Sequence, residues 1–331
     1  MLINFFNRAV MQGIPLLYGS TGEIISQKAG NMNLGIPGTM YVGAISGVIG
    51  AFIYEQSLNS SEAINPVLGI FIPVICCILG SLLMGLIYCF LTVTLKSNQN
   101  VTGLALTTFG IGVGNYFGGS LIKLVDTEVP SIALSATSEV FSTKLPFADK
   151  LGWFGQMFLS YSFLAYFAII VAVVASVMLT KTRAGLNLRA VGENPATADA
   201  AGIKVTRTKY AATCVGSIIA GLGGPYYIMD YADGIWSNNA FGDRGWLAIA
   251  LVIFALWRPN ISIFGSIAFG GLLILHNVAY EFIKIDANTQ ELFQMTPYIM
   301  TIIVLIIVSA RKKREHQPPQ SLGLTYFREE R

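Results

Sequence analysis

The chain has 331 residues, of which 53% are hydrophobic and 12% are charged, and its formal net charge is +3. Soluble domains carry about 25% charged residues, so this composition excludes a soluble protein, and so small a positive charge does not indicate a nucleic-acid partner. Because a helix needs about 20 apolar residues to cross a bilayer, the chain has room for about eight to ten crossings and for no large extramembrane catalytic domain.

Segments without Asp, Glu, Lys or Arg predict where the crossings lie. Seven such segments are long enough to span the bilayer, and two, 9–22 and 245–257, are shorter. The seven longer segments are 29–54, 63–95, 97–122, 156–180, 210–229, 259–280 and 292–310. We therefore predict an all-α polytopic membrane protein with one transmembrane domain over 1–310 and a polar cytoplasmic tail over 311–331.

The first segment, 9–22, is predicted to be an imperfect helix that is retained. Residues 1–19 lack the basic flank, compact apolar run and small-residue cleavage site of a secretory signal. A full crossing would put the N-terminus outside the cell, whereas an interfacial path would leave it inside. The sequence leaves both alternatives open.

The next segment contains residues that interrupt helices. Gly35, Pro37 and Gly38 follow the two asparagines Asn31 and Asn33 within one short stretch. Irregular backbone at membrane depth is tolerated only where it is buried in protein or lines a cavity. Close packing through small residues is the alternative explanation. The paired asparagines favour a solute pathway, because their amides can bond either the opened backbone or a polar solute.

The segment 181–209 is basic and is predicted to lie in the cytoplasm. It holds six Lys and Arg against two acidic residues, and a second basic run follows at 311–314. Short translocated loops carry few such cations. Asn194-Pro195 is a helix-start signal and Gly202 a stop signal, so we expect a short helix between them. A plain basic anchor loop is the alternative.

Two later segments also depart from a regular span. Residues 221–225, Gly-Leu-Gly-Gly-Pro, predict a packing kink, and the aromatic residues that follow at 226–236 are expected to form an interfacial belt. The thirteen residues 245–257 reach only about 20 Å as a helix. This short segment therefore needs an extended lead-in, and together with 30–38 it fits paired interrupted helices in a transporter.

No catalytic or metal site is predicted. The four cysteines lie in apolar runs, and the two histidines are isolated from each other. The sequence has no G-x-x-x-x-G-K-[ST] phosphate loop, so we expect the chain to bind no ATP and no other cofactor.

Residues 189–203, RAVGENPATADAAGI, resemble the cytoplasmic coupling segment of ABC-importer permeases of the branched-chain amino acid, ribose and nucleoside group. The resemblance extends through Gly22-Glu23, Ala29-Gly30, 33–38, 220–224 and 245–250, and is nearest to the nucleoside and simple-sugar type. The chain departs from that type at Pro37, where the type usually has glutamate, and this departure leaves the exact solute open.

The resemblance implies an importer for a small polar solute, most simply a nucleoside or sugar, with a flavin or amino acid as further possibilities. It also implies a separate ABC ATPase subunit that uses the ATP, a second, non-identical permease, a solute-binding lipoprotein outside the cell, and a place in a bacterial plasma membrane with the C-terminus in the cytoplasm. An ion-coupled secondary transporter and a membrane-embedded enzyme are the alternatives. The carrier predicts intramembrane carboxylates, which the long charge-free segments lack.

The resemblance assigns two groups of residues. The ATPase would dock on the coupling segment, about 185–205. The residues expected to couple are Arg189, Gly192, Glu193, Asn194 and Gly202. The residues expected to line the solute pathway are Asn31, Asn33, Gly35, Gly38, Phe109, Asn115 and Trp246. Of these, Phe109 and Trp246 could stack on a base or sugar face, and Asn115 could equally bridge two helices.

Overall fold

The computed structural model describes residues 2–58, 64–125, 131–143, 152–279, 295–311 and 317–327. Nearly all of these residues are helical, which confirms the predicted all-α class. The long helices are α1 (Leu2–Lys28), α2 (Ile36–Ser57), α3 (Pro66–Cys89), α4 (Gln99–Val125), α7 (Phe163–Lys181), α10 (Val205–Pro225), α12 (Pro259–Ala279) and α14 (Thr296–Arg311).

Shorter elements connect the long helices. They are α5 (Ser135–Phe141), α6 (Gly152–Phe158), α8 (Arg183–Glu193), α9 (Pro195–Ala200) and α11 (Arg244–Phe254), with π-helical turns η1 (Phe90–Thr94) and η3 (Tyr226–Tyr231). Strands β1 (Ile132–Ala133) and β2 (Ile235–Trp236) pair antiparallel, with Ile132 opposite Trp236.

Four stretches of the described chain are long and apolar enough to cross a membrane. They are Ile36–Ser57, Pro66–Thr94, Phe163–Lys181 and Val205–Tyr231. Helices α1 and α4 have 27 residues each, which corresponds to about 40 Å of helix. The chain is therefore a polytopic membrane protein, as the charge-free segments predict.

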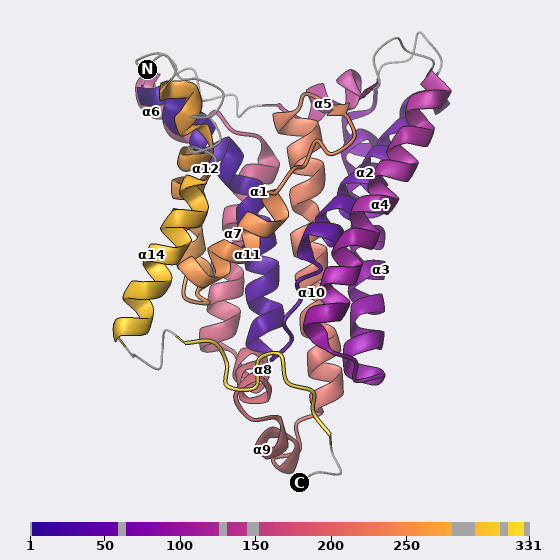
Figure 1. Ribbon diagram of the computed structural model, residues 1–331. Coiled ribbons are helices and arrows are strands. Elements are labelled where there is room, and N and C mark those ends of the chain that lie inside the picture. Colours follow the sequence, from indigo (N-terminus) through magenta and orange to yellow (C-terminus); the bar gives the residue numbers. More distant parts are fainter. Residues whose placement is uncertain are drawn as a thin grey trace.

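The helices form a bundle whose two ends differ (Figure 1). Helices α1 and α10 run through its middle, with α12 and α14 on one side and α3 and α4 on the other. Helix α1 begins at the end marked N and finishes beside α8, at the opposite end of the bundle. Helix α1 thus runs the full height of the bundle, as a complete crossing would.

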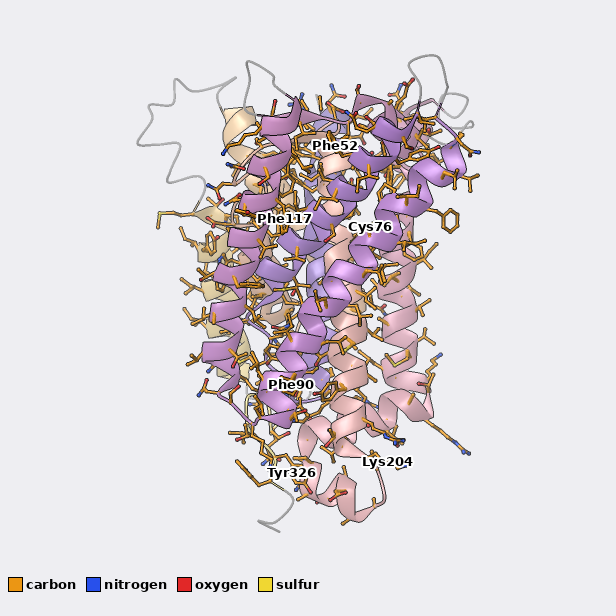
Figure 2. The ribbon with its side chains drawn as sticks, turned by 90° about the vertical axis from the view of Figure 1, so that its right-hand side faces the viewer. Phe52, Cys76, Phe90, Phe117, Lys204 and Tyr326 are labelled. Atoms are coloured by element: carbon orange, nitrogen blue, oxygen red, sulfur yellow. The ribbon has the colours of Figure 1, made fainter. Side chains whose placement is uncertain are left out.

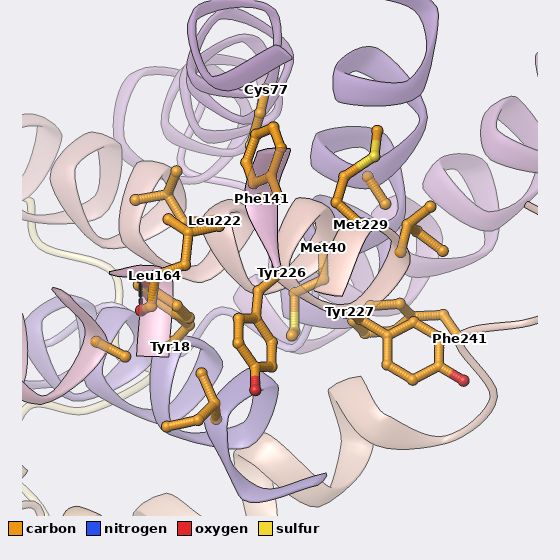
Figure 3. Close-up of a cluster of buried hydrophobic side chains, with 14 of the residues drawn as sticks. Tyr18, Met40, Cys77, Phe141, Leu164, Leu222, Tyr226, Tyr227, Met229 and Phe241 are labelled. Atoms are coloured by element: carbon orange, nitrogen blue, oxygen red, sulfur yellow. Dashed lines mark hydrogen bonds between the residues drawn. The ribbon is translucent and has the colours of Figure 1, made fainter. Parts of the chain in front are cut away.

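The core fills the space between α1, α2 and the end of α10 (Figure 3). The Tyr18 hydroxyl donates a hydrogen bond to the Leu164 carbonyl oxygen at 2.7 Å, which joins α1 to α7. Close approach of α10 to α2 depends on a glycine, because a Cβ on Gly224 would lie 2.6 Å from the Ala44 nitrogen. This contact confirms the packing role expected for residues 221–225.

The expected interfacial belt at 226–236 is wrong. Tyr226 is fully buried and Trp236 is 1% exposed, and both belong to the core. The reason is that α10 continues into η3, which packs Tyr226 against α1 and α2, while Trp236 on β2 packs edge-on against the Tyr41 ring of α2. A belt residue would instead keep its polar end in the headgroup region.

Candidate functional site

The interruption predicted near residue 30 is present and is built almost entirely inside the protein. Residues 29–35 separate α1 from α2, and we call them the α1–α2 break. Gly30 has a φ of +84°, which favours glycine because a side chain is strained there. The Met32 nitrogen donates to Gln99 Oε1 at 2.7 Å, and the Met32 carbonyl accepts from the Tyr88 hydroxyl at 2.7 Å. Side chains thus replace the hydrogen bonds that a continuous helix would have made.

A buried carboxyl group organises one side of the break. Glu23 has no exposed surface, and its Oε1 accepts hydrogen bonds from the Asn33 nitrogen at 2.9 Å and from Gln27 Nε2 at 2.8 Å. Gln27 Oε1 accepts in turn from Trp257 Nε1 at 2.5 Å. The network ties the last turns of α1 to the break and to the residues that follow α11.

Sequence reasoning singled out Glu23 only as part of the family resemblance. Glu23 directly follows the charge-free segment 9–22. In the sequence its carboxyl group therefore indicates the end of an apolar segment and not a buried position. Its burial depends on α10 and α11 packing against α1, which no local pattern reveals. The interior therefore does contain a carboxyl group, in contrast to the absence of intramembrane carboxylates expected from the long charge-free segments.

The two asparagines of the break are buried and hydrogen-bonded within the protein. Asn31 Nδ2 donates to Thr213 Oγ1 on α10 at 2.8 Å, and Asn33 Oδ1 accepts from the Gly35 nitrogen at 2.9 Å. Asn31 is fully buried and Asn33 is 1% exposed. Their side chains shape the backbone of the break, and contact with a solute stays a prediction.

The two interrupted segments of the sequence meet in space. Helix α11 has only 11 residues, as its short apolar run predicts, and it ends before Leu256 and Trp257, which both have a φ of +55°. A Cβ on Gly245 would collide with Pro37 in the first turn of α2. Pro37 suits that turn because it fixes φ and needs no amide donor.

Helix α4 closes the other side of the first turn of α2. A Cβ on Gly38 would collide with the Leu106 carbonyl oxygen, and Thr107 Oγ1 donates to the Leu34 carbonyl at 2.7 Å. Gly35 also faces α4, while Trp246 on α11 is half-buried. The break and α4 therefore meet at the first turn of α2, where Asn33, Gly35 and Gly38 lie, and α11 reaches the same turn through Gly245, the neighbour of Trp246.

The remaining predicted pathway residues, Phe109 and Asn115, lie further along α4. Phe109 is 54% exposed and points away from the core. Asn115 Nδ2 donates to Asn239 Oδ1 at 2.9 Å, and the Asn239 nitrogen donates to Asn115 Oδ1 at 3.2 Å. This pair supports the bridging alternative for Asn115. Phe117, marked in Figure 2, is also exposed on α4, so this helix presents an aromatic outer face.

Arg244, the first residue of α11, forms a cluster that the sequence did not predict. Arg244 Nη2 donates to Gln12 Oε1 at 3.0 Å, and Arg244 Nη1 donates to the Phe241 carbonyl at 3.0 Å. Its guanidinium carbon lies 4.2 Å from the centre of the Tyr227 ring, a cation–π contact. The only signal for this cluster is a single Arg at the start of an apolar run.

The coupling segment forms two helices joined at one residue. The Asn194 side chain caps α9 by accepting from the Thr197 nitrogen at 3.0 Å, and Gly202, with a φ of +84°, ends the segment. Helix α9 has six residues, in agreement with the short helix expected there. Glu193, Asn194 and Gly202 are exposed. Helix α9, which Asn194 precedes and Gly202 follows, lies at the tip of the bundle (Figure 1).

Gly192 lies on the inner side of this segment. A Cβ on Gly192 would collide with the Lys28 carbonyl oxygen and would lie 3.2 Å from the Gly30 nitrogen. The end of α8 therefore rests directly on the end of α1 and on the break. No side chain separates the coupling segment from the α1–α2 break at this point.

Arg189 faces a cavity of about 700 Å³ at the same end of the bundle. Lys28, Glu193, Trp257 and Arg258 are among the residues that line it, and no predicted pathway residue does. Both Arg189 and Glu193 line this cavity, but Arg189 is half-buried, whereas Glu193 is exposed. The described part of the chain holds no group of three His, Cys, Asp or Glu that could bind a metal ion.

Comparison with known proteins identifies relatives over nearly the whole chain. The chain is 27% identical over 318 residues to the nucleoside ABC transporter permease NupC of Lactococcus lactis, covering 95% of this chain and 93% of NupC. It is 24% identical over 319 residues to the guanosine ABC transporter permease NupQ of Bacillus subtilis, covering 96% and 94%.

A third relative is a Haloferax volcanii protein, TsgC13, provisionally named a glucose ABC transporter permease. It is 29% identical over 298 residues, which cover 90% of this chain and 84% of TsgC13. No solved structure gives a significant match. Residues 5–305 match the family described as "Branched-chain amino acid transport system / permease component". The chain belongs to this family of ABC transporter permeases.

Proposed function

We propose that the chain is one transmembrane half of a bacterial ABC importer for a nucleoside or a simple sugar, powered by a separate ATPase subunit. Family membership and the names of its relatives, which include nucleoside, guanosine and glucose permeases, support this assignment. They favour an importer over an ion-coupled secondary carrier. Flavins and amino acids remain further solutes to test.

The observation that carries the mechanism is the direct contact between the coupling segment and the α1–α2 break at Gly192. An ATPase that binds the exposed tip at Glu193, Asn194 and Gly202 would move α8 and α9. Because α8 rests on the Lys28 carbonyl and the Gly30 nitrogen, that movement would reach the break without a flexible intermediate. The break could then change its packing against α4 and α11.

The same arrangement supports an orientation in the membrane. The coupling segment is rich in Lys and Arg, and we place it in the cytoplasm together with the C-terminal segment that lies beside it. Since α1 begins at the opposite end of the bundle, the N-terminus would lie outside the plasma membrane. The chain would bind no ATP itself.

We further propose two protein partners besides the ATPase. A second, non-identical permease is supported by the chain's similarity to two permeases of one organism: NupC and, at 25% identity over 263 residues, NupB of Lactococcus lactis. The outer aromatic face of α4, with Phe109 and Phe117 exposed, offers a surface for it. A solute-binding lipoprotein would deliver the solute from outside.

Reconstitution in proteoliposomes tests this function. The chain, purified with the subunits that accompany it, should import labelled guanosine or glucose when ATP is supplied to the ATPase side and the binding protein to the other. Uptake that persists without ATP and follows a proton or sodium gradient would identify a carrier. Competition by unlabelled nucleosides, sugars, flavins and amino acids would identify the solute.

A further inference from the structure

The C-terminal segment, to which the sequence assigns no function, packs across the coupling end of the bundle. We call residues 317–327 the C-terminal strap. In Figure 1 the strap is the yellow trace that leaves the side of α14, passes α8 and reaches the vicinity of α9. Ser321 within it is only 6% exposed, so this part of the strap is buried rather than loose.

The first anchor of the strap joins α8 to the α1–α2 break. The Ser321 nitrogen donates to the Gly192 carbonyl at 3.0 Å, and the Ser321 hydroxyl donates to the same oxygen. The Gly192 carbonyl is one of the last of α8 and has no partner within an ideal helix. Two residues later, the Gly323 nitrogen donates to the Gly30 carbonyl at 3.3 Å.

The second anchor is a bridge through Gln99 at the start of α4. Gln99 Nε2 donates to the Leu324 carbonyl at 3.3 Å, while Gln99 Oε1 accepts from the Met32 nitrogen at 2.7 Å. Gln99 is 3% exposed. One buried side chain thus holds the strap and the break at the same time.

The third anchor reaches the outermost helix. The Tyr326 hydroxyl donates to Asp199 Oδ2 on α9 at 2.9 Å. Lys96, between η1 and α4, places its Nζ 4.2 Å from the centre of the Phe327 ring. Figure 2 shows Tyr326 at the same end of the bundle as Lys204, which directly precedes α10.

We propose that the strap is part of the coupling machinery and makes the coupling segment, the α1–α2 break and the start of α4 move as one unit. Its anchors fall on these three elements, and they act in addition to the contact at Gly192. Without the strap, α9 would be linked to the break through α8, by way of the junction at Asn194, and through its packing against α10, whose Thr213 accepts a hydrogen bond from Asn31. This inference rests on the proposed function.

Two truncations of the complete importer complex test the role of the strap. Deletion of 318–331 removes the anchors, whereas deletion of 328–331 leaves them and is the matched control. The measured quantity is the solute imported per ATP hydrolysed. We expect the longer deletion to keep ATP hydrolysis and to lose most of the uptake, and the control to behave as the wild type. A wild-type ratio in the longer deletion would overturn the proposal.

Point variants keep the test decisive if the longer deletion fails to assemble. Ser321→Thr keeps the hydroxyl group, and Ser321→Val replaces it with a methyl group of similar shape. The double variant Ser321→Val, Tyr326→Phe should import several-fold less solute per ATP than Ser321→Thr. Equal ratios in the two would overturn the proposal. A wild-type complex without any ATP-dependent uptake would instead refute the proposed function.

Amide hydrogen exchange, measured on the same complexes, tests the contact between the strap and the break separately from assembly of the complex. The amides of the break at 29–33 should exchange faster in the double variant than in Ser321→Thr, because the strap and the break share Gln99. Unchanged exchange there would show that the strap does not hold the break.

Discussion

Replacing Glu23 by leucine should destabilise the permease strongly, whereas replacing it by glutamine should not. In the structure Glu23 Oε1 accepts two hydrogen bonds in a fully buried place, from the Asn33 nitrogen and Gln27 Nε2. Leucine would leave both donors without a partner. Each buried donor that loses its partner costs about 1–3 kcal/mol, so the expected loss is about 2–6 kcal/mol. Glutamine keeps one acceptor oxygen in the same position.

The loss is large against a typical total stability of about 5–15 kcal/mol. The free energy of unfolding, measured by titration of mixed micelles with a denaturing detergent, provides the assay. Glu23→Gln is the matched control, because its shape is the same and only the second, unpartnered oxygen changes. A leucine variant that is as stable as the glutamine variant would refute the reasoning that this network holds the break.

Three further variants probe the coupling segment and the break. Gly192→Val should separate α8 from α1 and lower both uptake and stability. Gly119→Ala, whose added methyl group meets open space, should change neither. A thermal-shift measurement reports the stability, and an uptake assay reports the transport. Gly202→Leu forces a side chain into left-handed backbone, which costs about 1–2 kcal/mol. Combined with a bulky residue in place of Glu193, it should abolish uptake and leave membrane insertion intact. Asn33→Ala should change the selectivity of uptake in a complex that still assembles.

Specific outcomes would contradict these expectations. Wild-type uptake in the variant with bulky residues at 193 and 202 would exclude the coupling role of this tip. Wild-type uptake of every transported solute by Asn33→Ala would remove Asn33 from the solute pathway and leave it a purely structural role.

Local signals were sufficient for the elements whose form depends on neighbouring residues. Asn194-Pro195 and Gly202 bound the short helix α9 because a side-chain cap and a left-handed glycine act within one turn. The shortness of α11 followed from the length of one apolar run. The break at 29–35 followed from its glycines and asparagines and from Pro37, which lies just after it.

Contacts between distant parts of the chain could not be predicted in the same way. The belt assigned to 226–236 was wrong because the direction of those rings depends on η3 and on the core around Tyr226. Gln99, Trp257 and Ser321 each bond to residues far away in the sequence, and nothing in their own surroundings marks them. For the same reason, the sequence predicts only a polar tail where the structure has the C-terminal strap.

The assignment to an ABC importer is tested most directly by affinity purification of the chain from native membranes in mild detergent, with mass spectrometry of the accompanying proteins. We expect to recover an ATP-binding subunit, a second permease and a solute-binding lipoprotein. Recovery of the chain alone, with solute uptake that continues without ATP and follows an ion gradient, would contradict the assignment.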